Sequence, residues 1–267
     1  MRKLKWGAAL LAAFCLGLQS LAALAYGADK KEIVRKARQS YYNLANAGLN
    51  EFRCQVLPDW DTTFNGLKAD PVGRDQVLPI LRKTHFELVV GPKGASTVSH
   101  QSELAPPNED VAERVRKAIG GTEQILTGFL QTWSQFMINS TPLPDTDGDY
   151  QLEDIGDKYR LTAKEGSVDA IILMTRNFEI EELKVTTPEF SGTVRPRLVR
   201  IKNQFILASY EGVYSIKSGN PQELSVKIEY GEVEGLSLPS KVIATMQLPT
   251  ATVEFPFTFA NCQVKKR

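Results

Sequence analysis

The residues of this chain that could do chemistry are few, and they are poorly arranged for catalysis. The two histidines, His85 and His100, fall within one predicted hairpin, and no G-x-S-x-G elbow marks a nucleophilic serine. A Ser-His-Asp arrangement could still assemble in space. Asp59 and Asp61 flank Trp60, but glycosidase carboxyls need a rigid cleft, and an exposed loop explains this segment equally well. We therefore expect a protein that is not an enzyme and binds no cofactor.

The most metal-like stretch is an acidic run that contains Asp145, Asp147 and Asp149. Alternate carboxylates can converge on a hard cation such as calcium. The run departs from an EF-hand loop, because Tyr150 stands where that loop needs glycine and Gly156 stands where it needs glutamate. Aspartate and glycine also favour turns. We expect a turn here rather than a metal site, with the three aspartates as weak candidate ligands.

Cys54 and Cys262 are a candidate disulfide. An isolated pair of cysteines favours one bridge in an oxidising compartment. The bridge would join the first strand of the fold to the last, and its role would be structural because the pair forms no C-x-x-C motif. Two buried free thiols are the alternative, since sequence does not fix cysteine geometry.

An apolar stripe on a predicted helix is the strongest candidate for ligand binding. Its members are Ile125, Phe129, Trp133, Phe136 and Met137. Packing in the core is the simpler interpretation, because helices normally bury one face. In the functional interpretation these side chains form one wall of an apolar cavity. The opposite wall would come from a late strand with Phe255, Phe257 and Phe259.

The elements that would position these residues follow a predicted leader. Residues 1–25 have the pattern of a secretory signal peptide: basic residues, an apolar stretch, and Ala23-Leu24-Ala25 at the end. Gln19 and Ser20 interrupt the apolar stretch, which falls short of the roughly 20 residues that span a bilayer. Cleavage is therefore favoured over an uncleaved anchor. We expect the mature chain, residues 26–267, to be periplasmic or secreted.

The mature chain is nearly neutral. Loss of three of the 32 basic residues with the leader leaves 29 against 31 acidic ones, a net charge near −2. This charge is too small to steer the protein onto nucleic acid or acidic lipid. A chain of this length can bury one large core, so we expect a single β domain.

Helical periodicity predicts a helix over residues 29–50 and a helical insertion over about 108–139, with a break at Gly120-Gly121. Between them we expect a strand at 52–57, a polar loop, a short helix near 75–83 and a hairpin. The strands of that hairpin would span residues 85–90 and 96–104.

From Tyr150 to the end of the chain, strand follows strand. Residues 225–230 and 253–259 alternate polar and apolar side chains, and turn residues recur at hairpin spacing. Strands joined so closely must be antiparallel. Pro256 within the last strand predicts an edge or a bulge. The predicted fold class is α+β and mainly antiparallel β, with helices lying against a curved sheet.

The last third of the chain also resembles a known family. Residues Tyr230 to Val242 read Tyr-Gly-Glu-Val-Glu-Gly-Leu-Ser-Leu-Pro-Ser-Lys-Val, where Gly235 permits a turn and Pro239 opens a strand. This pattern, with the strand that follows it to residue 263, resembles the outer-membrane lipoprotein-sorting (LolA-like) superfamily. The resemblance implies a curved half-barrel sheet with helices packed across its concave face. It also implies an apolar interior that shelters acyl chains without catalysis.

The leading hypothesis is an exported carrier or binding protein for an apolar ligand, a lipid or a lipoprotein acyl chain, in the cell envelope. The alternative is a structural or interaction protein of the envelope with a filled core and a protein partner. A hydrolase with an unrecognised site is the least favoured hypothesis.

Overall fold

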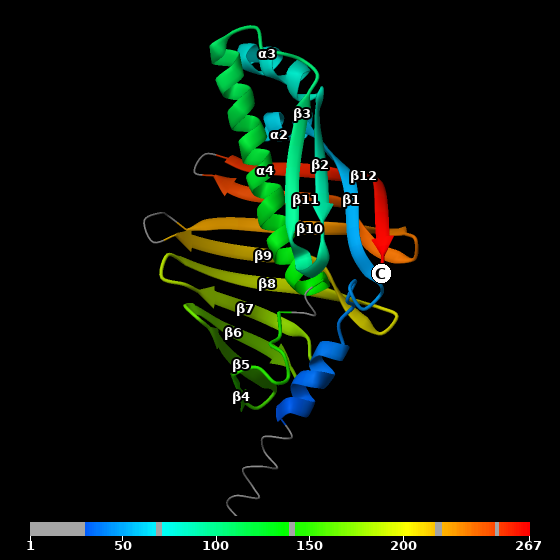
Figure 1. The fold of residues 1–267 in the computed structure, drawn as a ribbon. Coiled ribbons are helices and arrows are strands. Elements are labelled where there is room, and N and C mark those ends of the chain that lie inside the picture. The colour runs from blue at the N-terminus through cyan, green and yellow to red at the C-terminus, as the bar shows by residue number, and fades with distance from the viewer. Residues whose placement is uncertain (1–29, 68–70, 139–141, 217–220, 249–250) are drawn as a thin grey trace, which may run out of the picture.

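The described strands of this protein form one open antiparallel sheet (Figure 1). The computed structural model describes residues 30–67, 71–138, 142–216, 221–248 and 251–267, so the predicted leader lies outside the described residues. The sheet has 12 strands in the order β3-β2-β1-β12-β11-β10-β9-β8-β7-β6-β5-β4. Strands β3 and β4 are its two edges.

The C-terminal half is a meander in which each strand pairs with the next. Its strands are β4 Tyr150–Asp154, β5 Lys158–Glu165, β6 Val168–Thr175, β7 Ile180–Thr186, β8 Phe190–Ile201, β9 Gln204–Ile216, β10 Gln222–Val233, β11 Leu236–Leu248 and β12 Ala251–Lys266. Every pairing is antiparallel, as the short connections predict. The prediction of a mainly antiparallel β fold is confirmed.

The N-terminal strands extend this meander beyond its last strand. β1 (Leu49–Pro58) pairs with β12 on one side and with β2 (Thr84–Val90) on the other. β2 and β3 (Ser96–Ser102) form the predicted hairpin around the 3-10 turn η1 (Pro92–Gly94). The first and last of the described strands therefore lie side by side in the interior of the sheet, third and fourth from the β3 edge.

The predicted disulfide joins these two strands. Cys54 of β1 and Cys262 of β12 are bonded, with their Cα atoms 4.2 Å apart and a sequence separation of 208. The bridge lies at a bulge of β12, where Asn261 has φ 51°. Asparagine tolerates this left-handed conformation better than most residues do. A disulfide is consistent with a periplasmic or secreted location.

Four α-helical segments accompany the sheet in the described part of the chain. They are residues 30–39, α2 (Trp60–Leu67), α3 (Pro71–Leu81) and α4 (Glu109–Met137). The 29-residue α4 confirms the helix predicted near 108–139. The Asn108 side chain accepts a hydrogen bond from the backbone N–H of Val111, which caps the first turn. Among the described residues, no helix is long and apolar enough to cross a membrane.

The predicted break at Gly120-Gly121 is wrong, because α4 runs through it without interruption. Ile119 and Thr122, on either side of the two glycines, are buried. Each glycine costs a helix only about 1 kcal/mol relative to alanine, and burial of the apolar stripe outweighs that cost.

The prediction of a helix over 29–50 is wrong beyond residue 39. The backbone N–H of Tyr42 donates to the carbonyl of Phe205, and that of Leu44 donates to the carbonyl of Met137 at 2.8 Å. Gly48 has φ +96°, which a helix does not allow, and β1 begins at the next residue. Contacts with β9 and with the end of α4 therefore override the helical periodicity.

Two shorter predictions also need correction. α2 occupies the predicted polar loop, and the Asp59 carboxylate caps it by accepting a hydrogen bond from the N–H of Thr62. The helix expected near 75–83 begins at Pro71 and ends at Leu81.

Pro256 lies in an interior strand, so an edge strand is the wrong prediction. Proline still donates no hydrogen bond to a neighbouring strand, and none is needed toward β1. β1 ends at Pro58, opposite Phe257, so no ladder donor is needed from Pro256 on that side. The carbonyl of Pro256 accepts a hydrogen bond from the N–H of Asp59, where the chain leaves the sheet.

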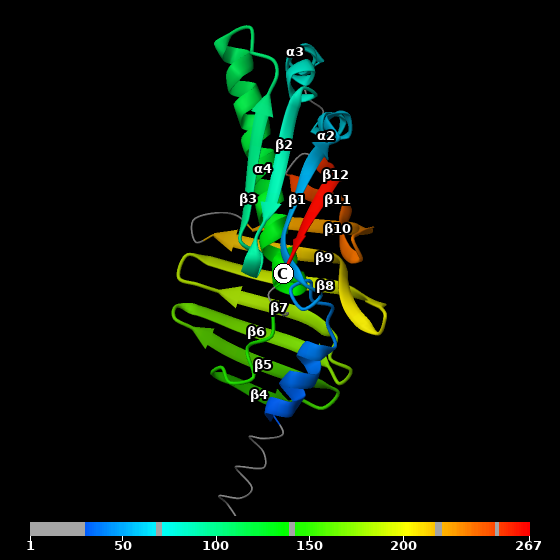
Figure 2. The same ribbon diagram turned by 45° about the vertical axis from the view of Figure 1, so that its right-hand side comes forward.

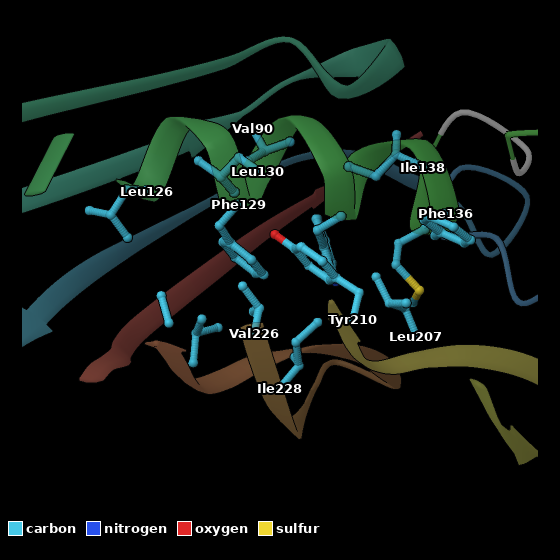
Figure 3. Packing of buried hydrophobic residues seen from close by; sticks show 14 of the residues in the cluster. Val90, Leu126, Phe129, Leu130, Phe136, Ile138, Leu207, Tyr210, Val226 and Ile228 are labelled. Carbon is cyan, nitrogen blue, oxygen red and sulfur yellow. The ribbon is translucent and has the colours of Figure 1, made fainter. Parts of the chain in front are cut away.

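α4 lies between two parts of the same sheet. In Figures 1 and 2 the β2–β3 hairpin passes on one side of α4, and β9 and β10 pass on the other. Figure 3 shows Leu130 pointing toward Val90 on the hairpin side, and Phe129 pointing toward Val226 and Ile228 of β10. We call the sheet face that α4 contacts the inner face.

A candidate binding groove between α4 and the sheet

An apolar groove of about 410 Å³ lies between α4 and the inner face of strands β7 to β11. This volume falls within the range of pockets that bind small molecules. α4 contributes Gln124, Ile125, Gly128, Gln131, Thr132 and Gln135, and the strands contribute Leu183, Val185, Phe190, Gly192, Val194, Tyr214, Gln222, Glu223, Leu224 and Met246.

The register of the strands makes the floor of this groove continuous. Directly paired residues of antiparallel strands point to the same face of a sheet. The pairing runs in one row across five strands, in the order Leu183, Val194, Gly212, Leu224 and Met246. The groove therefore has an apolar floor that crosses the strands instead of following one of them.

Two glycines let aromatic rings lie flat on this floor. A Cβ on Gly212 would stand 2.5 Å from the nearest ring atom of Tyr214, and one on Gly192 would stand 2.9 Å from the ring of Phe190. The two rings stack with their centroids 6.1 Å apart and their planes at 26°. Any larger residue at either position would push a ring away from the strand, so these glycines set the depth of the groove.

The wall formed by α4 combines a small residue with polar ones. A Cβ on Gly128 would meet nothing within 4 Å, so this residue opens onto free space in the groove. Gln124, Gln131 and Gln135 lie on one stripe of the helix and are exposed to solvent. They form the polar rim of an otherwise apolar site.

Three hydroxyl groups gather at the inner wall of the groove. Thr132 and Tyr214 line it, and Tyr210 of the same strand is 1% exposed. Burial raises the pKa of both phenols, and the Thr132 hydroxyl partly offsets that rise for each. The Tyr210 hydroxyl nevertheless makes no hydrogen bond of normal geometry within the described part of the chain. The wall thus holds neutral donors beside an apolar space.

The groove carries almost no charge. Glu223 is the one charged residue among those that line it, and none of them is lysine or arginine. A buried anion without a cationic partner is strongly destabilised. The lining therefore favours an uncharged ligand over a carboxylate or a phosphate.

One residue of the predicted apolar stripe lines the groove, and the other four lie in the core. Ile125 lines the groove. Phe129, Trp133, Phe136 and Met137 are each at most 1% exposed and belong to the hydrophobic core. The groove borders the neighbouring face of α4 instead, where glycine, threonine and glutamine predominate.

The predicted phenylalanine strand is divided in a similar way. Phe257 is 2% exposed in the core, and the ring of Phe259 contacts that of Phe129 at 6.1 Å between centroids. Phe255 is half-buried and lines a second, smaller cavity between α2, α4 and β12.

The acidic run before β4 contacts the N-terminal helical segment. Asp145 pairs with Arg38 at 2.8 Å, and Asp147 pairs with Lys31 at 2.9 Å. Asp149 is exposed. Across the described part of the chain, no three His, Cys, Asp or Glu side chains group as a metal site requires. These ion pairs hold the loop against the helix.

The remaining candidate residues make surface contacts. Asp61 pairs with Arg82 at 2.7 Å and with Arg74, and the hydrogen bond from Arg82 lowers the pKa of its carboxyl. His85 pairs with Glu103, and His100 pairs with Glu123 of α4, each at 2.7 Å. The second histidine thus links the edge hairpin to α4.

Sequence reasoning does not identify most of the groove floor. Strand alternation places Leu183 and Val194 on one face. The part of that face left open depends on the path of α4, which lies far away in sequence. The usable signal is Gly192 and Gly212, two glycines within neighbouring strands, where a close approach is expected.

Comparisons with known proteins identify no family. No family model and no curated protein matches the chain. Among solved structures, a chain of the crystal structure of MucB in complex with MucA(peri) aligns at 8% identity and a TM-score of 0.15. The alignment covers 90% of this chain and 99% of that chain. A likeness at this level carries no argument about function, and the resemblance of residues 230–263 stays a prediction.

Proposed function

We propose that this protein binds one elongated apolar ligand, such as an acyl chain, in the groove between α4 and strands β7 to β11, and carries it without chemical change. The observation that supports the proposal most is the 410 Å³ groove with a continuous apolar floor. The architecture proposed with it is the half-barrel expected from the sequence, with α4 across the concave face.

The charge of the residues that line the groove restricts the class of ligand. The lining offers no lysine or arginine to an anionic head group, and Glu223 would repel one. The hydroxyls of Thr132 and Tyr214, which line the groove, can instead donate to an uncharged carbonyl. The proposed ligand is therefore an ester- or amide-linked acyl chain. Its affinity would come from burial of methylene groups, at about 0.8 kcal/mol each before the costs of ordering.

Titration with monododecanoylglycerol, followed by calorimetry, tests this proposal. Gly128→Leu would place a branched side chain in the groove, whereas Gly128→Ala adds one methyl group at a position with open space. We expect saturable binding to the native protein and to Gly128→Ala, and a loss of about tenfold or more in Gly128→Leu, equivalent to burying about two fewer methylenes.

Dodecanoate provides a matched ligand with a charged head group. It should bind more weakly than the glycerol ester at neutral pH, since the groove has no cationic side chain. If the ester does not bind, or if Gly128→Leu binds it as well as Gly128→Ala does, the proposed function is wrong.

The packed core favours a second candidate, an interaction protein of the cell envelope. Phe129 and Trp133, for which the sequence leaves both a packed core and a cavity wall open, are buried in the hydrophobic core. Mass spectrometry of organic extracts from the purified protein separates the two candidates. Absence of lipid from the extracts, together with no binding of the glycerol ester, would favour the interaction protein.

A further inference from the structure

A second cavity lies at the other end of the same helix. It has a volume of about 160 Å³ and lies between α2, α4 and β12, where Trp60, Phe64, Gly121, Thr122 and Phe255 line it. Its lining is mainly apolar. Lys117 borders it, but this side chain is exposed and pairs with Glu113 at 3.4 Å.

Both cavities border the same stripe of α4. Ala118 and Gly121 line the small cavity, and Ile125, Gly128 and Thr132 line the groove. These positions follow one another at alternating steps of three and four residues, so they lie on one face of the helix. One face of α4 therefore borders both cavities.

The cavities are also neighbours on the sheet. Met246 lines the groove and pairs with Val253 of β12, while Phe255, two residues further along β12, lines the small cavity. On the helix, Ile125 follows Thr122 by about one turn. Ile125, which lines the groove, and Phe255, which lines the small cavity, are both half-buried.

We infer that the groove and the small cavity are two compartments of one channel along α4, and that the small cavity receives the end of a long acyl chain. This inference rests on the proposed function. The groove follows α4 from Gln124 to Gln135, about 16 Å at 1.5 Å per residue, whereas the stripe from Ala118 to Gln135 is about 26 Å long. An acyl chain that spans one leaflet of a bilayer is about 15 Å long, which is close to the length of the groove alone. A longer chain reaches the second compartment.

The polar groups give the ligand one orientation in this channel. The carbonyl lies near Thr132 and Tyr214, where hydroxyl donors gather. The methyl end then points toward Trp60 and Phe64, which are packed edge to face with centroids 6.4 Å apart. The small cavity thus makes the protein selective for chain length.

Neighbouring glycines of α4 supply the test and its control. Gly121→Leu directs a side chain into the small cavity, and Gly120→Leu makes the same change at a residue that lines neither cavity. In both positions a Cβ has open space. The probes are monoglycerides with octanoyl, dodecanoyl, hexadecanoyl and eicosanoyl chains, titrated by calorimetry. Urea unfolding of each variant checks that it folds, and Ala118→Leu is a second variant that narrows the same compartment.

In the native protein and in Gly120→Leu, affinity should rise by about fourfold per added methylene until the channel is full. In Gly121→Leu and Ala118→Leu, we expect the octanoyl ester to bind as in the native protein and the longest chains to lose about tenfold or more. If the long chains bind equally well to Gly121→Leu and Gly120→Leu, the channel is disproved while the groove proposal stands. If no chain binds to the native protein, the proposed function itself fails.

Discussion

The phenol of Tyr230 connects α4 to the sheet through two hydrogen bonds. It accepts one from Nε1 of Trp133 at 3.1 Å and donates one to the carbonyl of Leu207 at 2.7 Å. Burial raises the pKa of this phenol, so it remains a neutral donor in the folded protein. Its partner Trp133 is fully buried. One hydroxyl therefore satisfies two polar groups in the core between helix and strands.

Tyr230→Phe should lower the free energy of unfolding by about 1–3 kcal/mol, because it leaves buried donor and acceptor groups unpaired. Urea unfolding followed by tryptophan fluorescence measures this loss. Tyr150→Phe is the matched control, since its hydroxyl bonds to Thr146 from a half-buried position. An equal loss in both variants would contradict this role for Tyr230.

The disulfide gives a second prediction at the scale of single residues. Cys54→Ser with Cys262→Ser should lower the free energy of unfolding by about 2–5 kcal/mol, because the bridge closes a very long loop in the unfolded chain. Urea unfolding with and without reductant measures the effect. The reductant should destabilise the native protein and leave the double variant unchanged.

The disulfide could be predicted from sequence, whereas the cavity walls could not. An isolated pair of cysteines in a chain predicted to be exported favours one bridge over two free thiols, and the structure has that bridge. Phe129 and Trp133 have the same pattern whether they fill a core or line a cavity. Their place depends on the volume of partners such as Phe52 and Phe259, which only the folded structure brings against them.

At the scale of elements, strands β8 and β9 shape the groove because each has a glycine, with no side chain, at one position of the floor. Gly192 and Gly212 leave room for the rings of Phe190 and Tyr214 to lie against the sheet. Since both rings are at the far end of their side chains, crowding at the glycines would move the rings and leave the strands in register.

Gly212→Ala should therefore turn the Tyr214 ring into the groove and weaken binding of monododecanoylglycerol several-fold, with little loss of stability. Calorimetric titration and urea unfolding measure the two effects. Addition of Tyr214→Ala to this variant removes the displaced ring and should restore part of the affinity. Unchanged affinity in Gly212→Ala would show that the ring does not control access.

Elements with a strong local pattern are predictable from this sequence, and those fixed by distant contacts are not. The alternation of β10 and the periodicity of α4 are visible in the residues themselves. Residues 40–48 have helical periodicity, yet their backbone pairs with Phe205 and with the end of α4. α2 was predictable in principle, because Asp59 is a good N-cap residue.

At the scale of the whole molecule, buried phenols cause the free energy of unfolding to fall at alkaline pH. Burial raises the pKa of Tyr41, Tyr210 and Tyr230 above the ordinary value of about 10. Above that pH the unfolded chain releases protons that the folded chain retains. The contribution of these phenols to the free energy of unfolding is therefore complete below about pH 10 and declines as the pH rises further.

Urea unfolding across the alkaline range, with tyrosinate absorbance recorded in parallel, checks this prediction. The signal of the buried phenols should appear together with unfolding. Full ionisation of all tyrosines while near-ultraviolet circular dichroism remains native would contradict it.

The strand order has a consequence for how the chain folds during synthesis. Of the described strands, β1 is synthesised first and β12 last, yet these two strands pair with each other in the interior of the sheet. Until β12 emerges, these strands can form at most two separate sheets, β1–β3 and β4–β11, because β12 is the strand that pairs with both β1 and β11. A chain without β12 would leave β1 and β11 with unpaired edges, which are sites of aggregation. The 16-residue β12 is thus the strand on which the joining of the two parts of the sheet depends.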